Sequence, residues 1–290
     1  MTFQEQWLEI AKERNSVLCA GLDPAIFEMG RGDKGLPEGV DKSFWAIDYI
    51  EAVAPFCAAI KPNVQYWKND SDNEALELIY DTANDFGLLV IEDAKLADIG
   101  STDDAGMFYA ARRADAVTVA PYAGNIRDAA KLAKQRDIGI ITMCLMSNPE
   151  YKIEKNKLVP IENKDDYSKE DIIQCDDVHY VKQYIHLARE AQLSGIDGIV
   201  IGAPSKNNHI LDEEIAKVRS YVDDNMIVLL PGLGAQGGEA EMIWNHFGPY
   251  NVACNVGRAL MFPKGPQSTP KDWRDIAQQY NNMLNEIRGK

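Results

Sequence analysis

Lysine and aspartate side chains stand at the ends of three apolar segments of the sequence. One segment ends in Asp93-Ala94-Lys95, and because side chains alternate along a strand, Asp93 and Lys95 should lie on the same side. Asp23 and Lys61 end two further segments. Interior charges are costly unless they are paired, so we expect an array of alternating ammonium and carboxylate groups. The array would fix the ionisation state of each member and present a lysine as proton donor; a purely structural ion-pair network is the alternative.

Three further polar side chains follow apolar segments. Asp98 lies in the loop after Lys95, with Thr102 four residues later, and either one could extend the site or cap the next helix. Ser147 ends another apolar segment and precedes Asn148. Its hydroxyl suits a hydrogen bond to a polar ring, although Ser and Asn also begin turns. No histidine is placed beside Ser147 as a base, so a nucleophilic serine is not expected.

Residues 231–238 are rich in glycine and formally match the dinucleotide-binding pattern Gly-x-Gly-x-x-Gly. That interpretation requires an acidic residue about 20 positions later, whereas the next apolar segment ends in Gly257-Arg258. The amide of Gln236, the backbone at Gly257 and the guanidinium of Arg258 instead predict a phosphate site. The alternative is a tight turn beside a surface arginine.

Eight short apolar segments recur along the chain, separated by stretches with helical periodicity. They lack polar alternation, as expected of parallel strands buried on both faces. Eight strand–helix units in about 250 residues predict a single-domain (β/α)8 TIM barrel over residues 1–290, and a doubly wound open sheet is the alternative. The segments are 16–23, 57–63, 88–95, 116–121, 138–147, 198–204, 226–234 and 251–257.

Three stretches lie outside this pattern. Residues 1–15 predict a short amphipathic helix at the N-terminus. Residues 28–42 and 148–177 exceed normal loop length and follow strand ends, on the face where barrels build active sites. The role of 28–42 stays open, and 148–177 is expected to be a long loop that acts partly as a lid or rim.

The composition limits the classes of function. The 290 residues carry 45 acidic and 30 basic side chains, and the net charge of −15 would repel nucleic acid and anionic membranes. No apolar run approaches the roughly 20 residues that span a bilayer, and the charged N-terminus is unlike a signal peptide. The five cysteines form no Cys-x-x-Cys pair and the four histidines no metal motif, so we expect a cytoplasmic protein with no metal and no nucleotide cofactor. A small anionic substrate would need basic residues concentrated at its site.

The motif Asp93-x-Lys95-x-x-Asp98-Ile99-x-x-Thr102 resembles the signature of the orotidine 5′-phosphate decarboxylase family. The similarity covers essentially the whole chain and is closest to the longer bacterial branch. It implies a TIM barrel that decarboxylates orotidine 5′-monophosphate to uridine 5′-monophosphate in de novo pyrimidine biosynthesis, without a cofactor. The other matching segments are Gly21-Leu22-Asp23-Pro24, Lys61-Pro62-Asn63, residues 118–122, Ser147-Asn148-Pro149, residues 231–238 and Arg258.

The resemblance implies a role for each residue of the charged array. Lys95 would donate a proton to C6 of the pyrimidine, and Asp93 would lie beside the scissile carboxylate. Lys61 and Asp98 would complete a Lys-Asp-Lys-Asp network. Asp23 and Lys61 would contact ribose hydroxyls.

The remaining roles concern the partner subunit, the base and the phosphate. Asp98 and Thr102 resemble residues that family members donate across a dimer interface, so a homodimer is implied. Ser147 would contact the pyrimidine. Gln236 and Arg258 would hold the phosphate.

Some positions depart from the family pattern, namely Leu96-Ala97, Ala203-Pro204-Ser205 and Val256-Gly257, but none of them removes a charged group of the site.

Two alternative functions stay open. The first is a metal-dependent hexulose- or ketogulonate-phosphate enzyme, which shares the barrel and an Asp-x-Lys-x-x-Asp core. The second is a non-catalytic barrel that binds phosphosugars.

Overall fold

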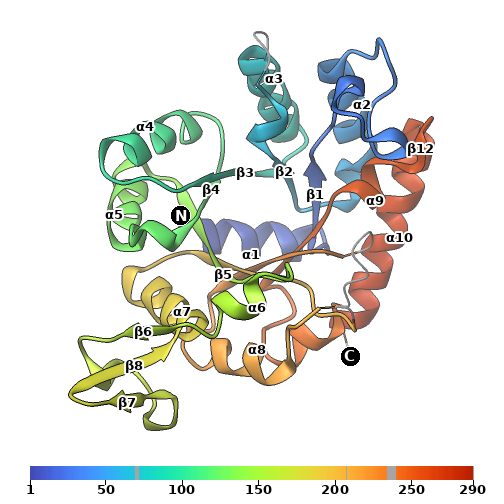
Figure 1. The fold of residues 1–290 in the computed structure, drawn as a ribbon. Coiled ribbons are helices and arrows are strands. Elements are labelled where there is room, and N and C mark those ends of the chain that lie inside the picture. The colour runs from blue at the N-terminus through green and yellow to red at the C-terminus, as the bar shows by residue number, and fades with distance from the viewer. Residues whose placement is uncertain (69–71, 207, 234–239, 290) are drawn as a thin grey trace.

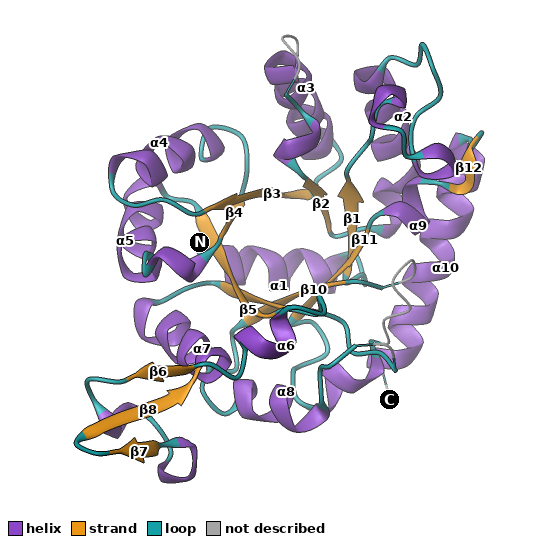
Figure 2. Ribbon diagram, in the orientation of Figure 1, coloured by secondary structure: helices purple, strands orange, loops and turns teal. Residues whose placement is uncertain are grey.

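A closed barrel of eight parallel strands forms the centre of the molecule (Figures 1 and 2). The computed structural model describes residues 1–68, 72–206, 208–233 and 240–289. The predicted barrel is confirmed and the open-sheet alternative is wrong, because the first strand pairs with both the second and the last. In order around the barrel, the strands are β1 (Leu18–Leu22), β11 (Val252–Val256), β10 (Ile227–Pro231), β9 (Gly198–Ile201), β5 (Gly139–Leu145), β4 (Ala116–Val119), β3 (Leu89–Leu96) and β2 (Ala59–Pro62).

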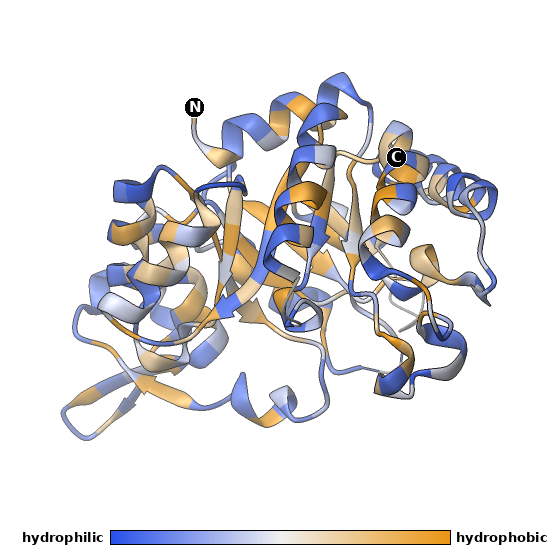
Figure 3. Cartoon of the chain, turned by 90° about the horizontal axis from the view of Figure 1, so that it is seen from above, coloured by the Kyte–Doolittle hydropathy of each residue, from blue (hydrophilic) through white to orange (hydrophobic). Residues whose placement is uncertain are grey.

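The barrel strands are buried because their side chains are apolar on both faces. Every residue of β1, β2, β4, β5 and β9 is buried. Figure 3 shows hydrophobic residues concentrated along the strands and on many helix faces. The few polar side chains within these strands are therefore exceptions that need partners or a function.

Helices surround the barrel, and α1 (Phe3–Glu13) closes its amino-terminal end (Figure 1). Trp7 of α1 is fully buried and donates a hydrogen bond from Nε1 to the carbonyl of Tyr250 at 2.7 Å. No helix in the described ranges has the length and apolar character needed to cross a membrane. The other helices are α2 (Lys42–Val53), α3 (Asp72–Asp85), α4 (Ser101–Ala110), α5 (Ile126–Arg136), α6 (Tyr151–Glu154), α7 (Gln183–Ser194), α8 (Asp212–Arg219), α9 (Arg258–Met261) and α10 (Pro270–Arg288).

The predicted loop 28–42 leads from β1 towards α2 and contains two short 3₁₀ turns, Phe27–Met29 and Gly32–Lys34. The second turn packs against β12 (Pro263–Pro266), a short strand between α9 and α10. The loop ends where Asp41 caps α2 by accepting hydrogen bonds from two backbone N–H groups. It is therefore an ordered wall beside the carboxyl end of β1.

Residues 148–177 do not form the predicted long loop. They contain α6 and contribute to a three-stranded antiparallel sheet that projects from the barrel (Figure 1). The prediction of a long loop was wrong because the strands in this segment are very short and mostly exposed, so they show no apolar pattern in the sequence. In order across this sheet, the strands are β6 (Leu158–Pro160), β8 (Val178–Lys182) and β7 (Ile173–Cys175).

Candidate active site

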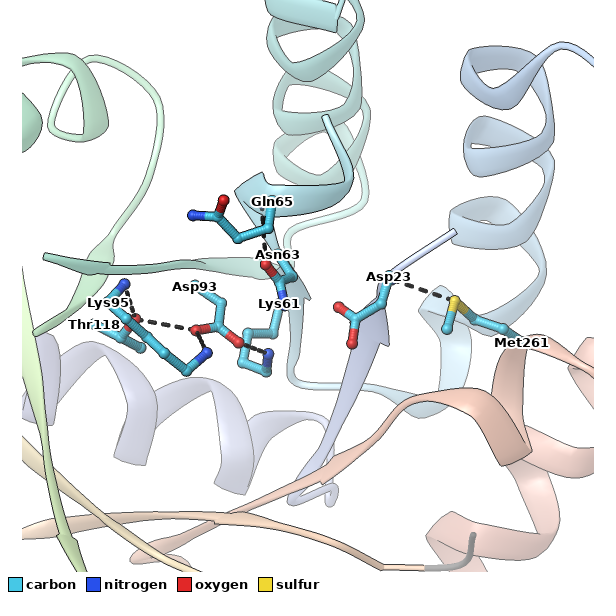
Figure 4. Close-up of polar contacts among 8 residues, drawn as sticks. All are labelled: Asp23, Lys61, Asn63, Gln65, Asp93, Lys95, Thr118 and Met261. Atoms are coloured by element: carbon cyan, nitrogen blue, oxygen red, sulfur yellow. Dashed lines mark hydrogen bonds and ion pairs between the residues drawn. The ribbon is translucent and has the colours of Figure 1, made fainter. Parts of the chain in front are cut away.

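Asp93 bridges two lysines at the carboxyl ends of β2 and β3 (Figure 4). Its Oδ2 accepts a hydrogen bond from Lys61 Nζ, and its Oδ1 accepts one from Lys95 Nζ. Lys61 is only 4% exposed and Asp93 7%, whereas the Lys95 side chain is 46% exposed. A buried ion pair thus holds an accessible ammonium in place, as the spacing in the sequence predicts.

Thr118 of β4 links the two members of the Asp-x-Lys motif. Its hydroxyl donates to Asp93 Oδ1 at 3.1 Å and accepts from the Lys95 backbone N–H at 2.9 Å. The side chain is 1% exposed. Our interpretation of the sequence assigned Thr118 no role of its own, although a hydroxyl inside an otherwise apolar strand was the available signal.

Lys95 reaches Asp93 through an irregular backbone. Its φ is +49°, in the left-handed region that non-glycine residues rarely adopt. The pairing of β3 with β4 also shifts register between Glu92 and Leu96. The expected contact between the motif's two residues is present, but regular strand alternation is not its cause. Strained backbone of this kind is often found at functional sites.

The charges of the array stabilise one another. Burial alone would raise the pKa of Asp93, but the ammonium groups of Lys61 and Lys95 outweigh it and hold the pKa well below its usual range. Burial would likewise lower the pKa of Lys61, but Asp93 and Asp23 outweigh it and raise that pKa. The array therefore keeps Asp93 ionised and Lys61 protonated at neutral pH.

Asp23 follows β1 and faces the same region from the other side of Lys61 (Figure 4). Its Oδ1 is buried and has no hydrogen-bond partner among the described residues. Burial raises the pKa of Asp23, and the nearby Lys61 ammonium opposes that rise. A buried carboxylate oxygen without a donor is an acceptor available to a ligand hydroxyl.

Two cavities meet at the lysine–aspartate array. The first, of about 580 Å³, is mainly polar, and the second, of about 440 Å³, is largely apolar. Lys61, Asp93 and Lys95 line both. The pair suits a molecule with an anionic end and a flat ring, joined at the array. The first cavity adds Asp23, Arg31, Lys34, Asn63, Asn255, Gly257 and Arg258, and the second adds Thr118, Met143, Met146, Ser147, Val200 and Leu229.

The structure brings most of the predicted site residues to these cavities, but not all of them. Asp98 and Thr102 are exposed and line neither cavity. They do not cap α4, whose N-cap residue is Gly100. Gln236 lies outside the described residues. The sequence interpretation also missed Arg31 and Lys34, because the role of their loop was left open.

A larger cavity of about 670 Å³ lies away from the array, between α5, α7 and the projecting sheet. Charged side chains in its wall are paired with each other: Arg127 binds Glu190 through two hydrogen bonds of 2.8 and 2.9 Å. Tyr167 and His186 are also hydrogen-bonded, at 3.0 Å. Size alone does not make this cavity the reactive site, because these four polar side chains in its wall already have partners.

The fold and the site define an enzyme of the (β/α)8-barrel class, with its charged residues at the carboxyl ends of the strands. Residues 16–269 match the model of the orotidine 5′-phosphate decarboxylase / HUMPS family. The chain belongs to this family, as its motifs led us to expect.

Curated relatives match along nearly the full chain. The sequence is 33% identical over 297 residues to the orotidine 5′-phosphate decarboxylase of Cupriavidus metallidurans, covering 99% of each chain. It is 34% identical over 288 residues to that of Azoarcus sp., covering 96% of each. Among solved structures, OMP decarboxylase of Leishmania donovani has the same fold, with a TM-score of 0.73, 22% identity and 100% coverage of both chains.

Proposed function

We propose that this chain decarboxylates orotidine 5′-monophosphate to uridine 5′-monophosphate, with Lys95 as the proton donor. The observation that carries the proposal is the position of the Lys61–Asp93–Lys95 array, where a polar and an apolar cavity meet. The names of its relatives support the same reaction.

The chemistry requires a cation at the carbon that loses CO2. The bond between C6 and the carboxylate breaks, CO2 departs, and the electron pair stays on C6. The ammonium of Lys95 stabilises this charge as it develops and donates a proton to C6, which is the differential stabilisation that lowers a barrier. Asp93 fixes the Nζ position, and because Lys95 is half exposed, its amine regains a proton from water.

The cavities suggest how the nucleotide lies. The pyrimidine ring fits the apolar cavity, where Ser147 offers a hydroxyl to its polar edge. The ribose then lies beside the unpaired oxygen of Asp23 and the Lys61 ammonium. The phosphate reaches Gly257 and Arg258. The family resemblance implies Gln236, which lies outside the described residues, as a further donor.

A second copy of the chain would complete the site. Asp98 and Thr102 are exposed at the start of α4 and are available to a neighbouring subunit. Large apolar side chains near them are also exposed, as at a surface that another chain covers. The exposed apolar residues are Ile99, Phe108, Tyr109 and Tyr122.

All five cysteines are free, which supports the cytoplasmic location that their spacing predicts.

One assay tests the reaction. Purified protein is mixed with orotidine 5′-monophosphate, and loss of the substrate's ultraviolet absorbance is followed with and without EDTA. We expect turnover that EDTA leaves unchanged, abolished in Lys95→Ala and retained in Lys131→Ala, which removes an exposed lysine of α5. Binding of uridine 5′-monophosphate without turnover would favour a non-catalytic barrel. Sensitivity to EDTA would favour a metal-dependent relative.

A further inference from the structure

We infer that Arg31 and Lys34, on the loop between β1 and α2, bind the phosphate of the substrate together with Gly257 and Arg258. This inference rests on the proposed function and extends it to two residues that the family motifs do not include. Both side chains line the same cavity as Asp23 and the array. They would form a second group of cations around the phosphate of the substrate.

The charge of this cavity is opposite to that of the protein. The whole chain carries a net charge of −15. Among the described residues, five cationic side chains but only two carboxylates, those of Asp23 and Asp93, line the cavity. Two of the cations, Lys61 and Lys95, are already hydrogen-bonded to Asp93. The remaining three are therefore the groups available to an incoming anion, and two of them belong to this loop.

The loop is built to hold these side chains beside the cavity. Gly30 and Gly32 flank Arg31 and have φ values of +64° and +53°, a conformation that glycine adopts without strain. The loop is anchored by Leu36, which is buried and donates its N–H to the Ala25 carbonyl at 2.8 Å. These features fix the backbone from which the two cationic side chains reach the cavity.

The same loop is tied to the segment that carries Arg258. The turn containing Lys34 packs against β12, which directly follows α9, and α9 begins at Arg258. Neither Arg31 nor Lys34 forms an ion pair within the described ranges. Two walls of one cavity therefore present unpaired cations, which is the arrangement that recognises a phosphate dianion.

Arg31→Gln, Lys34→Gln and the double variant test the inference. Each replacement removes one charge-assisted interaction worth about 1.5 kcal/mol or more, so KM for orotidine 5′-monophosphate should rise about tenfold per substitution. Affinity for uridine 5′-monophosphate should fall in parallel, while affinity for uridine, measured by NMR titration, should not change. Arg274→Gln removes an exposed arginine of α10 outside the cavity and should have no effect.

Two outcomes would overturn the inference. One is a double variant whose KM and affinity for uridine 5′-monophosphate stay within twofold of the wild type. The other is an equal loss of affinity for uridine, because the residues would then not act through the phosphate. Failure of the proposed function is distinguishable, since in that case the wild type itself would not consume orotidine 5′-monophosphate.

Discussion

Replacing Thr118 by valine would test whether the hydroxyl on β4 positions the reactive pair. The substitution nearly preserves volume at a site that is 1% exposed, but it removes both the 3.1 Å hydrogen bond to Asp93 and the 2.9 Å hydrogen bond from Lys95 N–H. A hydrogen bond to a charged group contributes about 1.5–3 kcal/mol. If that stabilisation also holds the transition-state geometry, kcat should fall by roughly 10- to 100-fold, because each 1.36 kcal/mol changes a rate about tenfold.

The split between kcat and KM distinguishes positioning from simple folding. In the proposed function Asp93 and Lys95 act at the reacting carbon, so Thr118→Val should lower kcat and change KM for the nucleotide by less than about threefold. Thr118→Ser retains the hydroxyl and should recover most of the rate. Thermal unfolding of both variants controls for stability. A valine variant with wild-type kcat, or a serine variant as impaired as the valine variant, would refute the positioning role.

Two further predictions concern the subunits and the response to acid. Homodimers of Lys95→Ala and of Asp98→Ala should both be nearly inactive, and mixing them should restore activity in one site per heterodimer; no recovery would mean that Asp98 serves its own barrel. Asp93→Asn should lower the free energy of unfolding by about 3–5 kcal/mol at pH 7, because it leaves buried Lys61 unpaired. The pKa of Asp93 is depressed on folding, so its contribution to stability is complete above its unfolded value of about 3.9 and is lost as pH falls below that value. Urea unfolding should therefore show the wild-type and Asn curves converging in acid, and parallel curves would contradict this linkage.

The barrel was predictable from the sequence because parallel strands are buried on both faces and therefore appear as uninterrupted apolar runs. The contact between Asp93 and Lys95 was predictable because charges next to buried strands must pair. The left-handed backbone of Lys95 was not, since the local sequence contains no glycine or turn signal there. The assumption of a regular strand therefore predicted the contact between Asp93 and Lys95 correctly, but the observed backbone that makes this contact is irregular.

The roles of Arg31 and Lys34 could not be read from spacing. Their loop has no periodicity, and only its packing against β12 brings it to the cavity that also contains Arg258. The projecting sheet was missed for a related reason: strands as short as Leu158–Pro160 are set by hydrogen bonding to β8 and not by an apolar pattern. Contacts between segments far apart in sequence decide both features.

Three features of the site add little to the stability of the protein or reduce it, and they lie in one cluster. A buried ion pair such as Lys61–Asp93 gains little net stability, because removing both charges from water offsets their attraction. The left-handed conformation of Lys95 costs about 1–3 kcal/mol. The Asp23 oxygen that has no hydrogen-bond partner in the described part of the chain adds a desolvation cost of similar size, about 1–3 kcal/mol. Apolar residues of similar volume would serve stability at least as well, so packing does not account for the cluster. The proposed function does: in that proposal a ribose hydroxyl would donate a hydrogen bond to Asp23, and the Lys95 ammonium would act on the reacting carbon of the nucleotide.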